Sequence, residues 1–236
     1  MVEPQHQAQA IVTIDGPAGV GKSTISRLLA EALAFTYLDT GSMYRAIAYL
    51  LTKDGKPVEQ LAGDESLIAR LQGLELALLP PLPGEEYGRI RIGGEVLGPE
   101  LRSEEMSQKA SAVSALPEVR MVLTALQQRL GERGKIVAEG RDMGTVVFPR
   151  AAWKFFLDAS PEERARRRAR QMRARGESQV DEAALLKGLI ERDAADRNRA
   201  IAPLRAADDA YIIDTTCLSI AEVVDGMLHS IRRKPL

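Results

Sequence analysis

A phosphate-binding loop is the clearest chemical signal in the chain. Residues 16–23 read Gly-Pro-Ala-Gly-Val-Gly-Lys-Ser, which satisfies the P-loop pattern G-x-x-x-x-G-K-S/T. Glycines let such a loop wrap around phosphates, and the amide groups that open the next helix face the anion. Lys22 is expected to reach the terminal phosphates of ATP, and the Ser23 hydroxyl to bind Mg²⁺. The residues predicted to hold ATP here are Gly16, Pro17, Ala18, Gly19, Val20, Gly21, Lys22, Ser23 and Thr24.

Switches, motors and kinases share the P-loop, so other polar clusters must decide the reaction. A GTPase switch should carry a D-x-x-G segment after its second strand and an N-K-x-D guanine loop, and neither is present. A kinase needs instead a second anionic pocket, in which fixed arginines hold the acceptor in line with the γ-phosphate. The sequence offers candidates for this pocket and therefore favours a kinase.

Three clusters combine arginine with other polar side chains. The first, at residues 39–45, reads Asp-Thr-Gly-Ser-Met-Tyr-Arg and follows a predicted strand, at the edge where open α/β sheets bind ligands. In the second, glycines bracket the Arg141-Asp142 pair, which is typical of a constrained turn that aims both charges inward. In the third, Arg192, Asp196 and Arg199 are spaced to share one helix face. The residues alone leave two alternatives open, an ordinary helix cap for the first cluster and a solvated ion-paired face for the third.

The helix expected after Ser160 is densely basic. It could bind RNA, form a solvated surface, or clamp the phosphates of ATP. Residues 160–200 contain no aromatic side chain on which a base could stack, so the phosphate clamp is the favoured interpretation. The arginines concerned are Arg164, Arg166, Arg167, Arg168, Arg170, Arg173 and Arg175.

Five short apolar runs alternate with helical patterns and must position these side chains. The runs cover residues 10–14, 35–38, 135–138, 153–157 and 211–213. Strands separated by helices predict an α/β fold with a five-stranded parallel sheet flanked by helices, as in P-loop NTPases. Ser160 and Ser219 each begin a capping-box pattern at a helix start.

Two segments interrupt the alternation. The first, at about 63–106, holds the hairpin signal Ile-Gly-Gly-Glu at residues 92–95 and is interpreted as an inserted lobe. The second, at about 161–199, is charged throughout and broken at Gly176, which predicts two helices and a mobile loop that act as a lid. We expect one P-loop kinase domain over residues 1–236, with these two segments as insertions.

Composition limits the possible partners. Lysine and arginine number 32 against 33 acidic residues, so no overall positive field favours nucleic acid or an anionic membrane. No apolar run approaches the roughly 20 residues of a membrane helix, and residues 1–9 are polar. With one cysteine and two histidines, neither an internal disulfide nor a Cys/His zinc cluster can form. A cytoplasmic protein without nucleic-acid or membrane partners is expected, with Cys217 as a small core residue.

Together the motifs resemble those of the bacterial cytidylate kinase family. The likeness runs from about residue 11 to residue 231 and rests on residues 14–24, 39–45, 139–149 and 196–199. The run Gly-Arg-Asp-Met-Gly-Thr-Val-Val-Phe-Pro at 140–149 is highly specific to that family, whereas the P-loop is widely shared. The resemblance implies an enlarged nucleotide-binding lobe and an arginine-rich ATP lid.

The resemblance also implies a role for individual residues. Arg45, Arg141 and Arg199 would hold the acceptor phosphate, and Arg141 and Arg199 would join Lys22 in catalysis. The rest of the acceptor pocket would comprise Arg192 and Asp196 at the ribose, Thr40 and Tyr44 along its wall, and Ser111, Arg120 and Asp142 at the base. Arg164 and Arg168 would close over ATP. The departures from the family pattern are Glu139 for aspartate, Ser23 for glycine and Ala195 for arginine.

The chemistry of cytosine favours the same function. Its amino group donates at N4 and its N3 and O2 accept, which complements a carboxylate such as Asp142 and a guanidinium such as Arg120. We expect a monomer that transfers the γ-phosphoryl group of Mg-ATP in line to CMP, and also to dCMP, without a histidine base. The alternatives are another acceptor (UMP, AMP or shikimate) and an ATP-dependent RNA-binding module.

Overall fold

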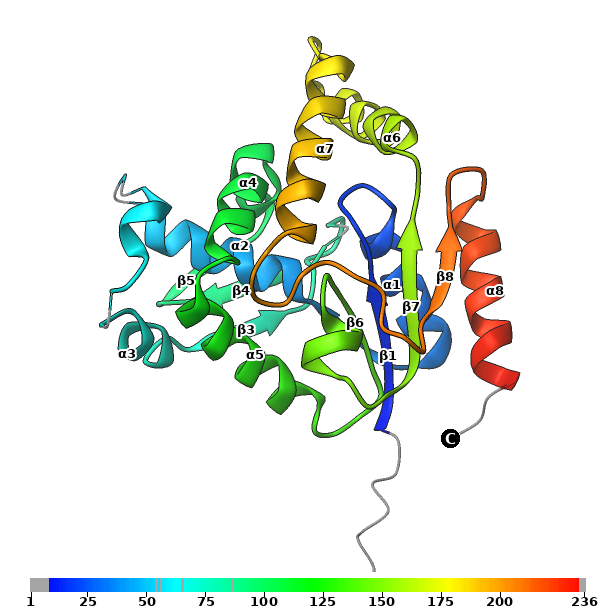
Figure 1. The fold of residues 1–236 in the computed structure, drawn as a ribbon, viewed down its shortest axis with the longest axis horizontal. Helices are drawn as coiled ribbons and strands as arrows, with labels where there is room; N and C mark the ends of the chain where they lie inside the picture. The colour runs from blue at the N-terminus through cyan, green and yellow to red at the C-terminus, as the bar shows by residue number, and fades with distance from the viewer. Residues whose placement is uncertain (1–8, 54, 56, 65, 86, 234–236) are drawn as a thin grey trace, which may run out of the picture. The chain divides into compact units, whose positions relative to one another are not determined.

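The five apolar runs form one parallel sheet, which confirms the predicted fold. The structure, a computed structural model, describes residues 9–53, 55, 57–64, 66–85 and 87–233. It has two units, one comprising the chain up to Asp39 and from Leu130 onward, and the other Thr40–Arg129. The sheet lies in the first unit, and all its strand pairs are parallel in the order β2-β6-β1-β7-β8 (Figure 1). Its strands are β1 (Gln9–Asp15), β2 (Thr36–Asp39), β6 (Ile136–Gly140), β7 (Ala151–Asp158) and β8 (Tyr211–Asp214).

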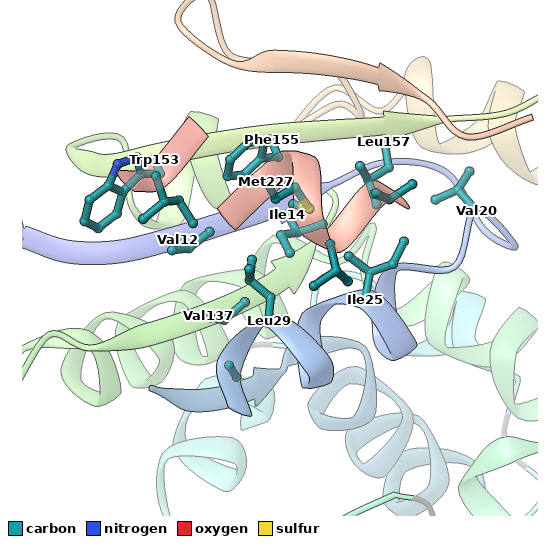
Figure 2. Packing of buried hydrophobic residues seen from close by; sticks show 14 of the residues in the cluster. Val12, Ile14, Val20, Ile25, Leu29, Val137, Trp153, Phe155, Leu157 and Met227 are labelled. Carbon is teal, nitrogen blue, oxygen red and sulfur yellow. The ribbon is translucent and has the colours of Figure 1, made fainter. Parts of the chain in front are cut away.

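One face of the sheet packs against two helices, α1 (Lys22–Leu33) and α8 (Ile220–Arg233). Alternate residues of β1 and β7 point to this face, as the two-residue period of a strand requires. Figure 2 shows their side chains meeting those of the helices in a closely packed apolar cluster. The cluster includes Val12, Ile14, Ile25, Leu29, Val137, Trp153, Phe155, Leu157 and Met227.

The residues between the apolar ones point to the opposite face, which is polar near β1. Thr13, Asp15 and Lys154 lie there, all at most 7% exposed. A π-helical turn, η3 (Met143–Val147), covers them, and the space around Gly144 is tight. A Cβ atom on Gly144 would lie 3.0 Å from Thr13 Oγ1 and 3.4 Å from Asp15 Oδ2. This close approach holds the start of η3 against β1.

Helices α6 (Pro161–Ala174) and α7 (Glu182–Arg197) form the arginine-rich segment. They pack on each other beyond the carboxyl end of β7 (Figure 1), and Gly176 at φ +91° lies in the connection between them. Ser160 caps α6 as predicted, by accepting a hydrogen bond from the Glu163 amide at 3.2 Å. The other half of this capping box is replaced, because the Ser160 amide donates to Thr216 Oγ1 at 3.0 Å. At α8, Ser219 and Glu222 make both bonds of the box.

The second unit contains a three-stranded antiparallel sheet with helices packed around it. The predicted hairpin is present, and Gly93 and Gly94, both with positive φ, form its two-residue turn. This unit extends beyond the predicted lobe at 63–106, and its role in binding a nucleotide stays a prediction. Its elements are α2 (Thr40–Thr52), η1 (Val58–Leu61), α3 (Ser66–Gln72), β3 (Leu76–Leu79), β4 (Arg89–Ile92), β5 (Glu95–Leu97), η2 (Pro99–Arg102), α4 (Glu104–Val113) and α5 (Pro117–Gly131), the last ending just past the boundary between the units.

One expectation from composition is wrong. Cys217, predicted as a core residue, is exposed in the connection between β8 and α8. Its apolar neighbours Leu218 and Ile220 are also exposed, so this connection contributes little to the core. Among the described residues, no helix is both long enough and apolar enough to span a membrane.

Candidate functional site

The P-loop connects β1 to α1, and its geometry depends on glycine. Gly16 has φ +148°, and a Cβ atom there would lie 2.1 Å from the Leu157 carbonyl oxygen, so no larger residue fits. Gly19 and Gly21 have φ values of +82° and +92°, a conformation that glycine adopts most readily. Gly21 is the N-cap of α1 and has no side chain to cap the helix amides. These amides are therefore suited to binding an anion.

Lys22 is the first residue of α1 and lies close to several other charges. Its side chain is 7% exposed, and Nζ donates to the Pro17 carbonyl oxygen at 2.6 Å. Burial holds the pKa of Lys22 well below its usual value, and the positive charges of Arg141 and Arg192 lower it further, against the opposing effect of Glu139 and Asp15. Cations gathered this closely favour an anionic ligand, because its charge relieves their mutual repulsion.

Two carboxylates lie side by side near the carboxyl ends of β2 and β6, and one of them bonds Ser23. Asp39 and Glu139 are buried and directly paired in the sheet register. Glu139 accepts hydrogen bonds from Tyr37 Oη and from the Ser23 side chain. Burial raises the pKa of Glu139, and the neighbouring Asp39 raises it further. The sequence reasoning missed this pair, although acidic residues at the ends of two neighbouring strands were a usable signal.

A hydroxyl and two adjacent carboxylates fit a hard divalent cation such as Mg²⁺. A cation would also offset the repulsion between Asp39 and Glu139. Among the described residues there is no group of three His, Cys, Asp or Glu side chains that could hold a metal ion alone. Mg²⁺ is usually bound by one or two carboxylates together with water and substrate phosphates.

The acceptor residues of the first unit meet at Asp196, which is 3% exposed. Arg141 Nε donates to Asp196 Oδ2 at 2.9 Å, and Arg199 Nη1 lies 3.9 Å from Asp196 Oδ1. Burial opposes ionisation of Asp196, but Arg141, Arg192 and Arg199 outweigh it and lower the pKa. The cluster is therefore a carboxylate held charged by guanidinium groups.

Arg192, Asp196 and Arg199 were predicted to share one helix face. This is correct for Arg192 and Asp196, which both lie in α7, and wrong for Arg199. Helix α7 ends at Arg197 with Asn198 as its C-cap, so Arg199 lies in the following loop. Its Nη2 donates to the Ala202 carbonyl oxygen at 2.9 Å, and the Leu204 amide donates to the Asp196 carbonyl oxygen at 2.8 Å. The loop folds back on the helix end, which brings Arg199 near Asp196 without continuing the helix.

Asp15 fixes the turn that carries Arg141 and Asp142. Its two carboxylate oxygens accept hydrogen bonds from the Met143 and Gly144 amides, both at 2.8 Å. Asp15 is the last residue of β1 and directly precedes the P-loop, so one carboxylate joins the start of that loop to the Arg141-Asp142 turn. The sequence analysis missed Asp15, although an acidic residue ending an apolar strand before a P-loop could have been flagged.

The buried Asp15 should make folding stability depend on pH. Burial, aided by Asp142, raises its pKa from 3.8 to about 7, against the opposing amide bonds and Lys22. The folded state therefore binds this proton more tightly than the unfolded state. Its stabilising contribution is complete below pH 3.8 and is lost as pH rises through about 7. At 1.36 kcal/mol per pKa unit, the free energy of unfolding should fall by about 4 kcal/mol across this range.

We expect the Asp15→Asn variant to lack this component. The measurement is urea unfolding of both proteins at intervals from pH 4 to pH 8. As pH rises, the free energy of unfolding of wild type should fall relative to that of the variant. Asparagine loses one of the two amide bonds, so the comparison concerns the pH slope and not the absolute stability. Parallel curves for the two proteins would contradict a raised pKa at Asp15.

The second unit holds the remaining predicted acceptor residues. Arg120 in α5 is 4% exposed, and its guanidinium lies 5.8 Å from the centre of the Tyr44 ring. Arg120 Nη1 also donates to the Ser114 carbonyl oxygen at 3.3 Å, one turn after Ser111 in α4. Arg45 Nη2 donates to Ser42 Oγ at 2.7 Å. The members of the predicted set in this unit are Thr40, Tyr44, Arg45, Ser111 and Arg120.

Most of the arginines of α6 have acidic or backbone partners. Glu163 accepts hydrogen bonds from Arg166, Arg167 and Arg170. Arg164 is 2% exposed and contacts the P-loop backbone, while Arg168 is half-buried. The roles of Arg164 and Arg168 toward ATP stay predictions.

A P-loop on a five-stranded parallel sheet, with arginines gathered at the same carboxyl edge, defines a P-loop kinase. A sequence profile described as "Cytidylate kinase" matches residues 12–233. The chain therefore belongs to the cytidylate kinase family, as its motifs predicted.

Similar proteins support this assignment. A cytidylate kinase of Carboxydothermus hydrogenoformans is 46% identical over 223 residues, covering 94% of this chain and 97% of that protein. One from Oleidesulfovibrio alaskensis is 47% identical over 222 residues, covering 94% and 98%. A crystal structure of an uncharacterized protein from Eubacterium ventriosum has a TM-score of 0.50 at 13% identity, covering 95% of this chain and 99% of the other, and shows the fold alone.

Proposed function

We propose that this chain transfers the γ-phosphoryl group of Mg-ATP to CMP, and also to dCMP, by direct in-line displacement. One observation carries the proposal: Asp15, directly before the P-loop of Lys22, accepts hydrogen bonds from the Met143 and Gly144 amides at 2.8 Å and so fixes the turn that carries Arg141 beside that loop. The lysine expected at the donor phosphates and an arginine expected at the acceptor thus share one electrostatic site. Membership of the cytidylate kinase family supports CMP as the acceptor.

In this reaction an α-phosphate oxygen of CMP forms a bond to the γ-phosphorus as the bond to the β-phosphate oxygen breaks, which gives CDP and ADP. The acceptor oxygen is already ionised near neutral pH, so no general base is required. Lys22, Arg141 and Arg199 would neutralise the charge on the equatorial oxygens of the migrating group. Catalysis would depend on position and charge and not on a covalent enzyme intermediate.

Mg²⁺, when bound, would supply positive charge to the phosphates of ATP, and Ser23, Glu139 and Asp39 would support it. Within the acceptor pocket, Asp142 and Arg120 would pair with the cytosine edge, with Ser111 beside them, and Thr40 and Tyr44 would line the wall. Arg45 would join Arg141 and Arg199 at the acceptor phosphate, and Arg192 and Asp196 would meet the ribose.

Arg164 and Arg168, with the segment at about 161–199, would form the lid over ATP. A monomeric state and a cytoplasmic location also stay predictions.

The test is ADP release measured with CMP, dCMP, UMP, AMP, GMP and shikimate at equal concentrations, with and without Mg²⁺. CMP and dCMP should give the highest kcat/KM, and chelation of the metal should abolish turnover. A kcat/KM for UMP, AMP or shikimate equal to that for CMP would overturn the proposed acceptor. Turnover that survives chelation would remove Mg²⁺ from the proposal.

A further inference from the structure

Arg164 connects the P-loop to the arginine-rich helices. Its Nη1 donates to the Ala18 carbonyl oxygen and its Nε to the Ala159 carbonyl oxygen, both at 3.1 Å. Its Nη2 donates to Asp193 Oδ2 on α7 at 2.5 Å. The guanidinium therefore binds the P-loop backbone, the connection between β7 and α6, and a carboxylate of α7 at once. With 2% of its side chain exposed, it is shielded from solvent and salt.

The P-loop packs tightly on this arginine. A Cβ atom at Gly19 would lie 3.2 Å from Arg164 Cβ and 3.7 Å from Arg164 Cα. A change in the backbone at Ala18 and Gly19 must therefore either move Arg164 or break its bond to Ala18. Both P-loop residues belong to the segment expected to wrap the phosphates of ATP, so the donor would act on Arg164 through the backbone.

Helix α7 carries a second carboxylate one turn after the first. Asp193 and Asp196 are three residues apart and so lie on adjacent turns of one side of the helix. Asp193 binds Arg164, whereas Asp196 binds Arg141 at the end of β6. One turn of α7 thus joins the P-loop contact to the residue expected to hold the acceptor phosphate. Hydrogen bonds link Ala18 to Arg164, Arg164 to Asp193, and Asp196 to Arg141, and the helix backbone connects the two carboxylates.

We propose that Asp193 is a positioning residue that couples donor binding to acceptor binding through its ion pair with Arg164. The proposal rests on the function given above, because it assigns ATP to the P-loop and CMP to the Arg141 side. A P-loop ordered by ATP fixes the Ala18 carbonyl, this fixes Arg164, and the ion pair then holds α7 where Asp196 orients Arg141. A buried charge pair suits this task, because leaving Arg164 without its carboxylate carries a large desolvation penalty.

The experiment measures CMP affinity by calorimetry with and without a saturating non-hydrolysable β,γ-imido analogue of Mg-ATP. For wild type we expect the analogue to tighten CMP binding by about tenfold, within the usual range for coupled sites. In Asp193→Asn this factor should fall to about twofold or less. Coupling is reciprocal, so CMP should lose the same effect on the affinity of the analogue.

A matched control comes from a second ion pair between the same helices. Arg173 Nη2 lies 2.8 Å from Glu182 Oε1, but both side chains are about half exposed, and Glu182 is not among the residues expected to bind either substrate. Glu182→Gln should keep the wild-type coupling factor, whereas Asp193→Glu, which retains the carboxylate, should recover part of it. Thermal unfolding of every variant shows which of them are folded at the temperature of the titration.

Each outcome is decisive. The proposal would be overturned if folded Asp193→Asn keeps the wild-type coupling factor, or if Glu182→Gln loses as much coupling as Asp193→Asn. It would also be overturned if the ATP analogue does not change the CMP affinity of wild type. If Asp193→Asn does not fold, the comparison of Asp193→Glu with Glu182→Gln decides. A wild-type chain that binds no CMP would instead overturn the proposed function, and the titrations would then use whichever acceptor the chain phosphorylates.

Discussion

Replacing Lys22 with methionine should lower kcat by about a thousandfold, because it removes a preorganised cation from the migrating phosphoryl group. The fold should survive. The lysine is buried with a depressed pKa, so its charge is poorly solvated, and methionine keeps the aliphatic part of the side chain. Single-turnover kinetics with CMP, alongside thermal unfolding, provides the measurement.

Lys154 offers a matched control, since it is a second buried lysine of the same unit, lies on β7 and is likewise 7% exposed. Its Nζ bonds the Pro149 carbonyl oxygen and Asp209, so Lys154→Met should lower stability while keeping kcat within about tenfold of wild type. If a folded Lys22→Met enzyme also stays within tenfold of wild type, then Lys22 has no role at the migrating phosphate.

Replacing Asp142 with asparagine should collapse the preference for CMP over UMP. Asp142 is 2% exposed, and a buried carboxylate suits the amino donor of cytosine but would face the carbonyl of uracil. Asparagine has nearly the same shape and can present either an oxygen or an NH₂ group. The loss of a charged hydrogen bond should reduce kcat/KM for CMP by about ten- to two-hundredfold, while UMP loses much less or gains.

The ratio of the two activities separates base recognition from a purely structural role. Asp196→Asn is the control, because it loosens Arg141 and should depress both substrates alike. If Asp142→Asn behaves in the same way, with both activities reduced and their ratio unchanged, Asp142 does not read the base. The assignment of cytosine as the preferred base would weaken with it.

The strands, the P-loop and the helix starts could be predicted because each depends on residues close together in sequence. Each of these predictions depends on a local preference that the folded structure retains. Examples are the apolar run at 10–14, the glycines at 16–21 and the cap at Ser160. The hairpin could also be predicted from adjacent residues, because two consecutive glycines allow its turn. The end of α7 was harder, because the loop that turns Arg199 back has no strong local signal before Pro203.

Contacts between distant residues could not be predicted in this way. Asp15 binds amides that lie 128 and 129 positions further along the chain, and Arg164 reaches back 146 positions to Ala18. An arginine in a basic run gives no sign that it will be buried and bound to a backbone carbonyl far away in the sequence. Likewise, the capping-box pattern predicts that the Glu163 carboxylate accepts a hydrogen bond from the Ser160 amide. That amide donates instead to the hydroxyl of Thr216, which lies 56 positions away.

The exposed Cys217 has a practical consequence for handling the protein. It is the one thiol in the chain, and it lies on the surface. A maleimide dye would therefore attach at a single known position without any prior mutation, and would report from the β8–α8 connection. The same thiol can join two chains but cannot bridge within one, so a preparation stored without reductant can accumulate a covalent dimer. Such a species would disappear on a reducing gel and would otherwise be mistaken for a native assembly.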